Sequence, residues 1–498
     1  MERYFGKCLS EYCDRDLDAW HMPGHKRSPE VSETSFREMK RYDVTELPGL
    51  DDLHAAEGAL RESMQQLCEV YGSYKSYYLV NGSTCGILTA ISAVCKRGDT
   101  IIMARNCHKS VYHIVALLEL HPVYIYPEII EPWNMCGGMQ VEQVREALEK
   151  HPEAKAVVFP SPTYEGIVSD VQAISAIAHQ KNVCVIVDEA HGAHLEFDTQ
   201  KIFPAIRCGA DLVIESLHKT LPCFNQCALL HISKQISKKD RDIVRNVEKY
   251  LNVYETSSPS YIFVADMEHG IVTADAWRTT GYAEYGNRLC AYRRKWEALK
   301  VIQVLKPEEV EEKYNFKYDQ TKIVIHHANL SGEELREILE NEYGIVVEMA
   351  SLYYVLAMSS VMDDEGMFER LDRALQDLDR RPALDSGKAV KSGFESLYLA
   401  VLSESREVNG ESDDKHLSAE ACIKYIPGVA WNKESSYVNT MDAVGKVAGE
   451  YVTVYPPGIP VCVPGEIISN ENIQYLKCCY EDGLTIHGIH DGKQIFLE

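Results

Sequence analysis

The chain has 498 residues, and 45% of them are hydrophobic, which is enough for a globular protein of about three domains. Aspartate and glutamate (75) outnumber lysine and arginine (51), and the resulting formal charge of −24 opposes binding to a nucleic-acid backbone. No apolar stretch resembles a secretion signal or reaches the length of a membrane span. We therefore expect a cytoplasmic protein that binds neither nucleic acid nor a membrane.

Residues 77 to 232 repeat one pattern, in which a short β-branched or aromatic run ends in a polar turn and a helical stretch usually follows. This alternation predicts an α/β fold with a mostly parallel sheet covered by helices on both faces. The predicted strands are YYLV (77–80), TIIMA (100–104), AVVFP (156–160), VCVIV (183–187), DLVIES (211–216) and CALLHI (227–232). The predicted helices are CGILTAISAVCKRG (85–98), SVYHIVALLEL (110–120), VEQVREALEKH (141–151) and VQAISAIAHQKN (171–182).

The pattern changes after about residue 285, where charged helical stretches dominate. We divide the chain into an N-terminal segment (1–60), a large cofactor-binding α/β domain (61–285), a small α+β domain (286–385) and a C-terminal domain (386–498). The best linker candidate is 380–393. Helices are predicted over 288–305, 331–344, 367–381 and 416–426, with one or two strands in 345–360.

Polar residues gather where the predicted strands end, and ligands of open parallel sheets bind beyond that edge. Asn81-Gly82-Ser83-Thr84 follows the strand YYLV and opens a helix. The stretch 105–110 follows TIIMA, Asp188 follows VCVIV, and the stretch 216–220, with Lys219, follows DLVIE. Glycine, hydroxyls, histidines, a lysine and an aspartate therefore converge on one edge.

The stretch VCVIVDEAHGAHLEF (183–197) admits three interpretations. A nucleotide-hydrolysing motor also needs a phosphate loop G-x-x-x-x-G-K-[ST], and no Gly-Lys pair of this chain precedes serine or threonine. A metal could bind His191 and His194 with Glu189 nearby, but zinc would want a further ligand, and none can be placed. The third interpretation is an organic cofactor held by Asp188.

The residues at this edge are the parts of a pyridoxal phosphate site. A phosphate would bind at the helix that NGST opens, facing backbone N–H groups and the hydroxyls of Ser83 and Thr84. Lys219 would form a Schiff base with the aldehyde, Asp188 would pair with a protonated ring nitrogen, and His108 would stack on the ring. Taken alone, NGST is a helix cap and the lysine and histidine are ordinary loop residues. The aspartate is harder to explain, because a carboxylate that ends an apolar strand needs a partner.

Several segments give the chain a resemblance to the Orn/Lys/Arg decarboxylase family, in its short bacterial form. That family has the aspartate-aminotransferase-like fold (fold type I). SLHKT together with DEAHGAH at this spacing is the most specific match. The matching segments are MPGHKR (22–27), DVTELPGLDDLH (43–54), LVNGSTCG (79–86), RNCHKSVYH (105–113), FPSPTYEGIVSD (159–170), VDEAHGAH (187–194), ESLHKTLP (215–222), SSPSY (257–261) and YPPGIPVCVPGE (455–466).

The resemblance implies a role for each matching residue. Lys219 carries the cofactor covalently, Asp188 holds its pyridine nitrogen, and His108 stacks on its ring. Either the lysine or His108 protonates Cα after decarboxylation. His191 lies close to the ring, and Glu466 lies on the substrate side. The implied phosphate contacts are Ser83, Thr84, Ser216 and His218.

The resemblance also implies an assembly. The active site of this fold lies at a dimer interface, so we expect a homodimer or a larger homo-oligomer in which TSSPS (256–260) reaches the partner's cofactor. No receiver-like N-terminal domain precedes MPGHKR (22–27), so the large rings of the long family members are not expected.

The implied activity is pyridoxal-phosphate-dependent decarboxylation of a basic amino acid to an amine, a precursor of polyamines. Arginine is the first candidate substrate, followed by lysine and ornithine. Glu466 would pair with the cationic side chain. The TELPGLDD loop (45–52), with Glu46, Asp51 and Asp52, either adds acids to the site or is a tight turn.

Two alternatives stay open. One is another fold type I enzyme, an aminotransferase or a lyase. No arginine follows Arg406, which leans against an aminotransferase, since such enzymes clamp the α-carboxylate with an arginine from the C-terminal part. The other is a catalytically inactive homologue that regulates a partner, although Lys219 and Asp188 are both present.

Overall fold

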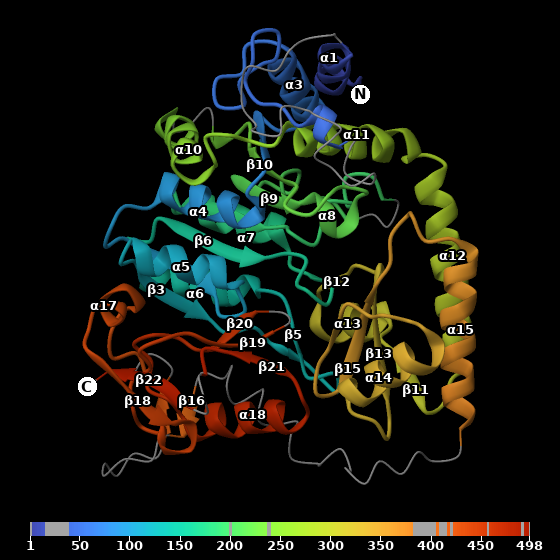
Figure 1. Cartoon of the computed structure of the whole chain (residues 1–498). Coiled ribbons are helices and arrows are strands. Elements are labelled where there is room, and N and C mark those ends of the chain that lie inside the picture. The colour runs from blue at the N-terminus through green and yellow to red at the C-terminus, as the bar shows by residue number, and fades with distance from the viewer. Residues whose placement is uncertain are drawn as a thin grey trace. The chain divides into compact units, whose positions relative to one another are not determined.

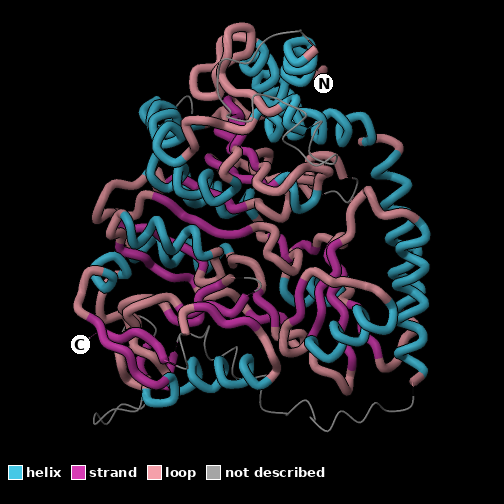
Figure 2. Tube along the Cα trace, viewed as in Figure 1, coloured by secondary structure: helices cyan, strands magenta, loops and turns pink. Residues whose placement is uncertain are grey.

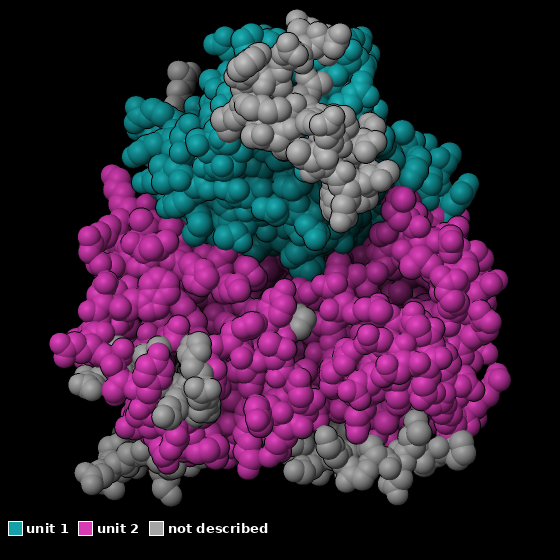
Figure 3. All heavy atoms as spheres, viewed as in Figure 1, with its two compact units in different colours: residues 1–94, 184–284 teal, residues 95–183, 285–498 magenta. Residues whose placement is uncertain are grey.

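The computed structural model describes residues 2–14, 39–198, 202–236, 241–381, 405–407, 416–418, 422–455, 458–489 and 493–497. The segment MPGHKR (22–27) and most of the predicted linker lie outside these ranges. The chain forms two compact units (Figure 3), each made of two separate stretches. Unit 1 is Met1–Val94 with Cys184–Glu284, and unit 2 is Cys95–Val183 with Tyr285–Glu498.

Unit 1 contains four neighbouring strands of a mixed sheet (Figure 1). Their order is β1 (Lys75–Leu79), β10 (Ala228–Ile232), β9 (Leu212–Ser216) and β8 (Cys184–Asp188), with β8 and β9 parallel and the other pairs antiparallel. Every residue of β8, β9 and β10 is buried, as expected for continuous apolar runs covered on both faces. The strand predictions from 183, 211 and 227 are therefore confirmed to within one residue at each end.

Helix α4 (Gly82–Val94) lies closely on these strands in unit 1. A Cβ atom at Gly86 would come within 2.8 Å of Leu79 Cδ1 and 2.9 Å of Ile214 Cγ2, so only glycine permits this approach. Helix α10 (Arg241–Tyr254) packs along α4 (Figure 1). Unit 1 also contains the helices α1 (Tyr4–Cys13), α3 (Ala59–Tyr71), α8 (Leu217–Thr220) and α11 (Tyr261–Trp277), of which α8 carries Lys219.

Unit 2 begins with three parallel strands. β2 (Thr100–Ala104) lies between β3 (His121–Ile125) and β6 (Ala156–Pro160). Helices lie between these strands in the sequence, so this part has the predicted alternation of parallel strands and helices. The helices are α5 (Lys109–Leu117), α6 (Val141–Lys150) and α7 (Val171–Gln180), and short strands form the pairs β4 (Ile129–Ile130) with β5 (Met135–Cys136) and β7 (Ile167–Val168) with β12 (Lys317–Tyr318).

An antiparallel sheet with helices follows in unit 2 and forms the predicted small α+β part (Figure 2). Its strand order is β11 (Ile302–Val304), β13 (Lys322–His327), β15 (Tyr354–Met358) and β14 (Met349–Ala350). The aromatic residues of α12 (Gly281–Trp296) pack into its core, and Tyr292 stacks on Phe368 of α15 (Glu365–Arg380) with ring centroids 5.2 Å apart. The helices are α12 (Gly281–Trp296), α13 (Pro307–Tyr314), α14 (Gly332–Tyr343) and α15 (Glu365–Arg380).

The C-terminal part of unit 2 is built around a three-stranded sheet. Its order is β20 (Ile459–Cys462), β19 (Val452–Tyr455) and β21 (Thr485–His487). Valine, isoleucine and cysteine side chains of these strands share one core with α18 (Asn470–Glu481). The remaining elements are α17 (Pro427–Trp431) and the strand pairs β16 (Ser405–Glu407) with β17 (His416–Ser418) and β18 (Ser435–Asn439) with β22 (Lys493–Leu497).

Two helix predictions need correction. The helix predicted over 416–426 is wrong, because 416–418 is strand β17 and the helix begins only at Pro427. Proline fits the first turn of a helix and disfavours helical backbone in the residue before it, here Ile426 with ψ 149°. The helix predicted over 288–305 ends at Trp296, and the β-branched residues Ile302 and Val304 belong to β11 instead.

Within the described ranges, the helices include none with the length and apolar character needed to cross a membrane.

Candidate active site

Lys219 lies in the short helix α8, directly after β9. Its ε-amine is 2.9 Å from Nε2 of His191, a buried residue that follows β8. Because β8 and β9 are parallel neighbours, their carboxyl ends meet at one edge of the sheet. The structure therefore brings these two predicted site residues into hydrogen-bonding distance.

Asp188 is the last residue of β8, and only 7% of its surface is exposed. One carboxylate oxygen, Oδ1, accepts a hydrogen bond of 3.2 Å from the Ala190 N–H. Burial raises the pKa of this carboxyl group, whereas the charge of Lys219 and the Ala190 N–H lower it, and the net pKa lies above the ordinary value. A cation placed against Asp188 would restore its ionised form, which is what a protonated ring nitrogen provides.

The turn Asn81–Thr84, made of the residue before α4 and the first three residues of that helix, follows β1 and is the predicted phosphate site. Gly82 has φ +74°, a backbone conformation that favours glycine. The Ser216 hydroxyl donates to Ser83 Oγ at 2.8 Å, so the two predicted phosphate ligands on separate elements are neighbours. Ser83 is half-buried and Thr84 is exposed, which leaves their hydroxyls and the first N–H groups of α4 accessible to an anion.

His218 lies beside Lys219 in α8. Its Nδ1 is 3.1 Å from the Cys227 carbonyl oxygen. Burial, and then the positive charge of Lys219, lower the pKa of His218, although the Cys227 carbonyl opposes this effect. A neutral imidazole whose Nδ1–H donates to this carbonyl has Nε2 as an acceptor, and it would bind a phosphate oxygen only by taking up a proton.

The donor set in unit 1 fits pyridoxal phosphate. The turn Asn81–Thr84 offers N–H groups and hydroxyls to a phosphate. The buried Asp188 carboxylate would be stabilised by a cation. The primary amine of Lys219 lies close enough to Asp188 for their charges to interact. These three groups match the anion, the ring nitrogen and the aldehyde of the cofactor.

His108 lies in unit 2, as the N-cap of α5. Its Nδ1 is 2.9 Å from Ser110 Oγ, and it accepts a longer bond of 3.3 Å from the Ser110 N–H. Gly458, directly before β20, is its neighbour: a Cβ atom there would lie 3.7 Å from His108 Cδ2, and φ at this glycine is +82°. Gly458 therefore lies close to the predicted ring-stacking residue.

Glu466, predicted on the substrate side, is buried in unit 2 and faces Arg105. The two side chains form an ion pair of 3.3 Å between Nη2 and Oε2, and both are almost fully shielded from solvent. The guanidinium also donates to the Pro460 carbonyl oxygen at 2.7 Å and to the Tyr112 hydroxyl at 3.0 Å. Sequence reasoning placed Arg105 at the sheet edge and gave it no role; its pairing with a residue 361 positions away has no local signal.

The acidic loop 45–52 contains a turn built on Asp51. The Asp51 carboxylate accepts hydrogen bonds from the N–H groups of Asp52, Glu57, Gly58 and Leu60 at 2.7–3.0 Å. Burial raises the pKa of Asp51, but the four hydrogen bonds together lower it by more than burial raises it. The net pKa is therefore below the ordinary value. This arrangement supports the tight-turn interpretation for Asp51.

The described residues contain no group of three or more histidine, cysteine or acidic side chains arranged to hold a metal ion. His191 instead contacts the amine of Lys219 at 2.9 Å.

Solved structures of lysine decarboxylases share this fold. The constitutive lysine decarboxylase of E. coli matches with a TM-score of 0.79 and 20% identity, covering 100% of this chain and 82% of its own. The lysine decarboxylase LdcF of Francisella novicida matches with a TM-score of 0.78 and 19% identity, covering 100% of this chain and 81% of its own. The fold and the residues at the sheet edge thus define a protein of the fold type I class, which confirms the predicted α/β class.

The sequence narrows this class to one family. Residues 4–366 match the Orn/Lys/Arg decarboxylase major domain, and residues 415–490 match the Orn/Lys/Arg decarboxylase C-terminal domain. The arginine decarboxylase of Bacillus subtilis (strain 168) is 30% identical over 97% of this chain and 94% of its own length. The chain belongs to the Orn/Lys/Arg decarboxylase family, so it is a decarboxylase, and the family implies pyridoxal phosphate as its cofactor.

Proposed function

We propose that this chain removes the α-carboxylate of a basic amino acid as carbon dioxide, with arginine as the first candidate substrate, then lysine or ornithine. The hydrogen bond of 2.9 Å between Lys219 and His191, beside the buried Asp188, is the observation that carries the proposal. The relatives favour arginine: arginine decarboxylases of Bacillus subtilis and Bacillus anthracis are 30% and 29% identical. The inducible lysine decarboxylase of Escherichia coli is 24% identical.

Pyridoxal phosphate, when bound, supplies an aldehyde that captures an amine and a conjugated ring that takes up the electron pair of the breaking bond. Lys219 would hold it covalently through the ε-amine. Asp188 would keep the ring nitrogen protonated, because a nearby anion favours the cationic form. The phosphate would be bound by Ser83, Thr84, Ser216 and His218.

Proton transfer is assigned to the groups around Lys219. His191 Nε2 lies within hydrogen-bonding distance of the ε-amine, so the two can exchange a proton. Either Lys219 or His108 would then return a proton to Cα after the carboxylate has left. The hydrogen bonds of Nδ1 to Ser110 orient this imidazole.

We predict that Glu466 binds the cationic side chain of the substrate. Its carboxylate already has a positive partner, Arg105, and is shielded from solvent. A substrate guanidinium would have to share the carboxylate with Arg105. The exposed Glu46 of the loop 45–52 is a second candidate, whereas Asp51 is engaged by four backbone N–H groups.

We also propose a homodimer or larger homo-oligomer in which residues 256–260 reach the partner's cofactor. The four-part domain division, the cytoplasmic location and a role in polyamine biosynthesis are likewise predictions. Size-exclusion chromatography with light scattering tests the proposed oligomeric state. A monomer that is fully active would contradict a shared site.

Carbon dioxide release from arginine, lysine and ornithine, measured in parallel on the purified protein with pyridoxal phosphate, tests the function. We expect release from at least one of the three and no oxo acid. An oxo acid in place of carbon dioxide would identify an aminotransferase. A protein that stays colourless with added cofactor and releases nothing would support an inactive regulatory homologue.

A further inference from the structure

Glu255 follows helix α10 and reaches the turn that is predicted to bind the phosphate. Its Oε1 accepts a hydrogen bond of 3.2 Å from the N–H of Asn81, the first residue of that turn. Only 7% of the Glu255 surface is exposed. The two residues are 174 positions apart, so this contact joins two distant parts of unit 1.

The same carboxyl group also interacts with the first turn of α4. Burial raises the pKa of the Cys85 thiol, and the nearby Glu255 carboxyl raises it further. Asn81 precedes the residues 82–84 and Cys85 follows them. Glu255 therefore interacts with the residues on either side of the segment 82–84, which holds the predicted phosphate ligands Ser83 and Thr84.

The neighbours of Glu255 fix it in place. The Asn81 side chain donates to the Tyr254 carbonyl oxygen at 3.0 Å, and the Tyr254 hydroxyl is 3.0 Å from Ser92 Oγ, near the other end of α4. On the other side, the Thr256 carbonyl oxygen is 2.8 Å from His54 Nε2. Tyr254 at the end of α10 is thus attached to Asn81, just before α4, and to Ser92 within α4, and Thr256 is attached to His54 of a separate loop.

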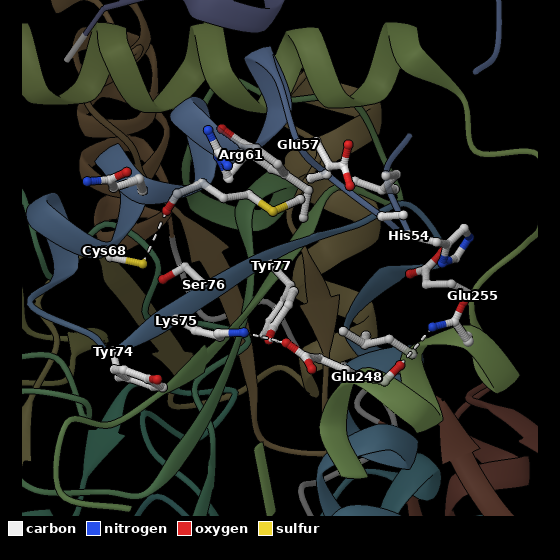
Figure 4. A pocket seen from close by; sticks show the side chains of 18 residues that line it. His54, Glu57, Arg61, Cys68, Tyr74, Lys75, Ser76, Tyr77, Glu248 and Glu255 are labelled. Atoms are coloured by element: carbon white, nitrogen blue, oxygen red, sulfur yellow. Dashed lines mark hydrogen bonds and ion pairs between the residues drawn. The ribbon is translucent and has the colours of Figure 1, made fainter. Parts of the chain in front are cut away.

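Glu255 lines one end of a pocket of about 620 Å³ in unit 1. Figure 4 shows it next to His54, apart from the pair formed by Lys75 and Glu248. Glu248 lies within α10, two turns before Glu255, and lines the same pocket, but it contacts Lys75 and Tyr77 instead of the turn. The pocket therefore offers a matched pair of acids, of which only one contacts Asn81.

We propose that Glu255 is a positioning residue for the cofactor's phosphate: its carboxyl group holds the turn Asn81–Thr84 in the conformation that binds the anion. The inference rests on the proposed function. A side chain that only accepts a hydrogen bond needs no charge for this task, so glutamine should replace Glu255. Alanine should not, because the Asn81 N–H would lose its acceptor and the turn would gain other conformations.

The test compares two forms of the cofactor. Pyridoxal phosphate and pyridoxal, which lacks the phosphate, are titrated into the full-length protein after removal of its cofactor, and binding is followed by visible absorbance. We expect Glu255→Ala to weaken pyridoxal phosphate binding about tenfold and to leave pyridoxal binding unchanged. Glu255→Gln and the control Glu248→Ala should both keep the wild-type preference.

The outcomes separate this inference from the proposed function. A wild-type protein that binds neither form would overturn the proposed function itself. A wild-type protein that prefers the phosphorylated form, together with Glu255→Ala that keeps the same preference, would overturn the role of Glu255 alone. If Glu255→Ala does not fold, a Glu255→Gln variant with an altered preference between the two forms would also refute it.

Discussion

The ε-amine of Lys219 lies 2.9 Å from Nε2 of His191, although 28 residues separate them in the chain. Each residue stands just beyond a strand of one parallel pair, β8 and β9, so the sheet itself sets their separation. A primary amine that shares a proton with an imidazole can be neutral as a nucleophile and charged as an acid at different stages. The contact with His191 thus allows Lys219 to act both as the nucleophile that attaches the cofactor and as an acid that gives up a proton.

Lys219→Ala should abolish turnover, with a loss on the order of 10⁴-fold or more, because both covalent attachment and a proton carrier are removed. The visible absorbance of covalently bound cofactor should disappear with it. Carbon dioxide release and an absorbance spectrum measure the two effects. Lys150→Ala, which changes an exposed lysine at the end of α6, is the control and should behave as wild type. An unchanged spectrum in Lys219→Ala would disprove the attachment.

Asp188→Asn should lower kcat by about 10²–10³-fold while the protein still folds and binds the cofactor. The amide has nearly the same shape as the carboxylate, but it supplies no negative charge to hold a protonated ring nitrogen. Steady-state kinetics at saturating cofactor measure the loss. Asp170→Asn changes the aspartate that caps α7 in unit 2 and serves as the control. Equal kcat values for wild type and Asp188→Asn would exclude the ring-nitrogen role.

Much of the fold could be predicted from the sequence because the decisive signals are local. The apolar run that ends at Asp188 gives a fully buried strand with a polar end. Ser331 and Gly344 mark the ends of α14, where Ser331 forms a capping box with Glu334 and Gly344 adopts φ +65°. The converging strand ends then predicted that Asp188 and Lys219 lie at one edge, whereas the position of His191 was implied by the family resemblance.

The contacts that sequence reasoning missed are long-range. Arg105 pairs with Glu466, and Asn81 with Glu255, across 361 and 174 residues. No periodicity or spacing encodes such partners, since they are fixed only when the elements pack. The wrong helix over 416–426 has another cause: its composition favours a helix, but β16 pairs with residues 416–418 and tertiary context overrides weak propensity.

Arg105→Met should destabilise the protein by about 3–5 kcal/mol, because it leaves the Glu466 carboxylate buried without its positive partner. Urea unfolding measures the loss, and the second change Glu466→Gln in the same chain should restore part of it. Arg145→Ala breaks the exposed pair with Glu142 and is the control, with an expected change of about 0–1 kcal/mol. Similar losses for both arginines would show that the buried pair contributes little.

Stability should fall as the pH rises, because Glu189 and Glu215 are buried together in unit 1. Burial, and then repulsion from another glutamate, raise the pKa of each well above its ordinary value. His231, with Nε2 3.7 Å from Glu215 Oε1, supplies no charge, since burial lowers its pKa to about 3. The folded chain therefore keeps protons that the unfolded chain releases above about pH 4.5.

With the folded pKa above the unfolded pKa, stability is fully present below the unfolded value and is lost as the pH rises through the folded value. Glu215→Gln removes one titrating group from this pair and should flatten the decline. Urea unfolding at a series of pH values from 4 to 9 measures the slope. Glu142→Gln, at an exposed position of α6, is the matched control and should keep the wild-type slope. A Glu215→Gln variant that declines as steeply as wild type would mean that other groups control the pH dependence.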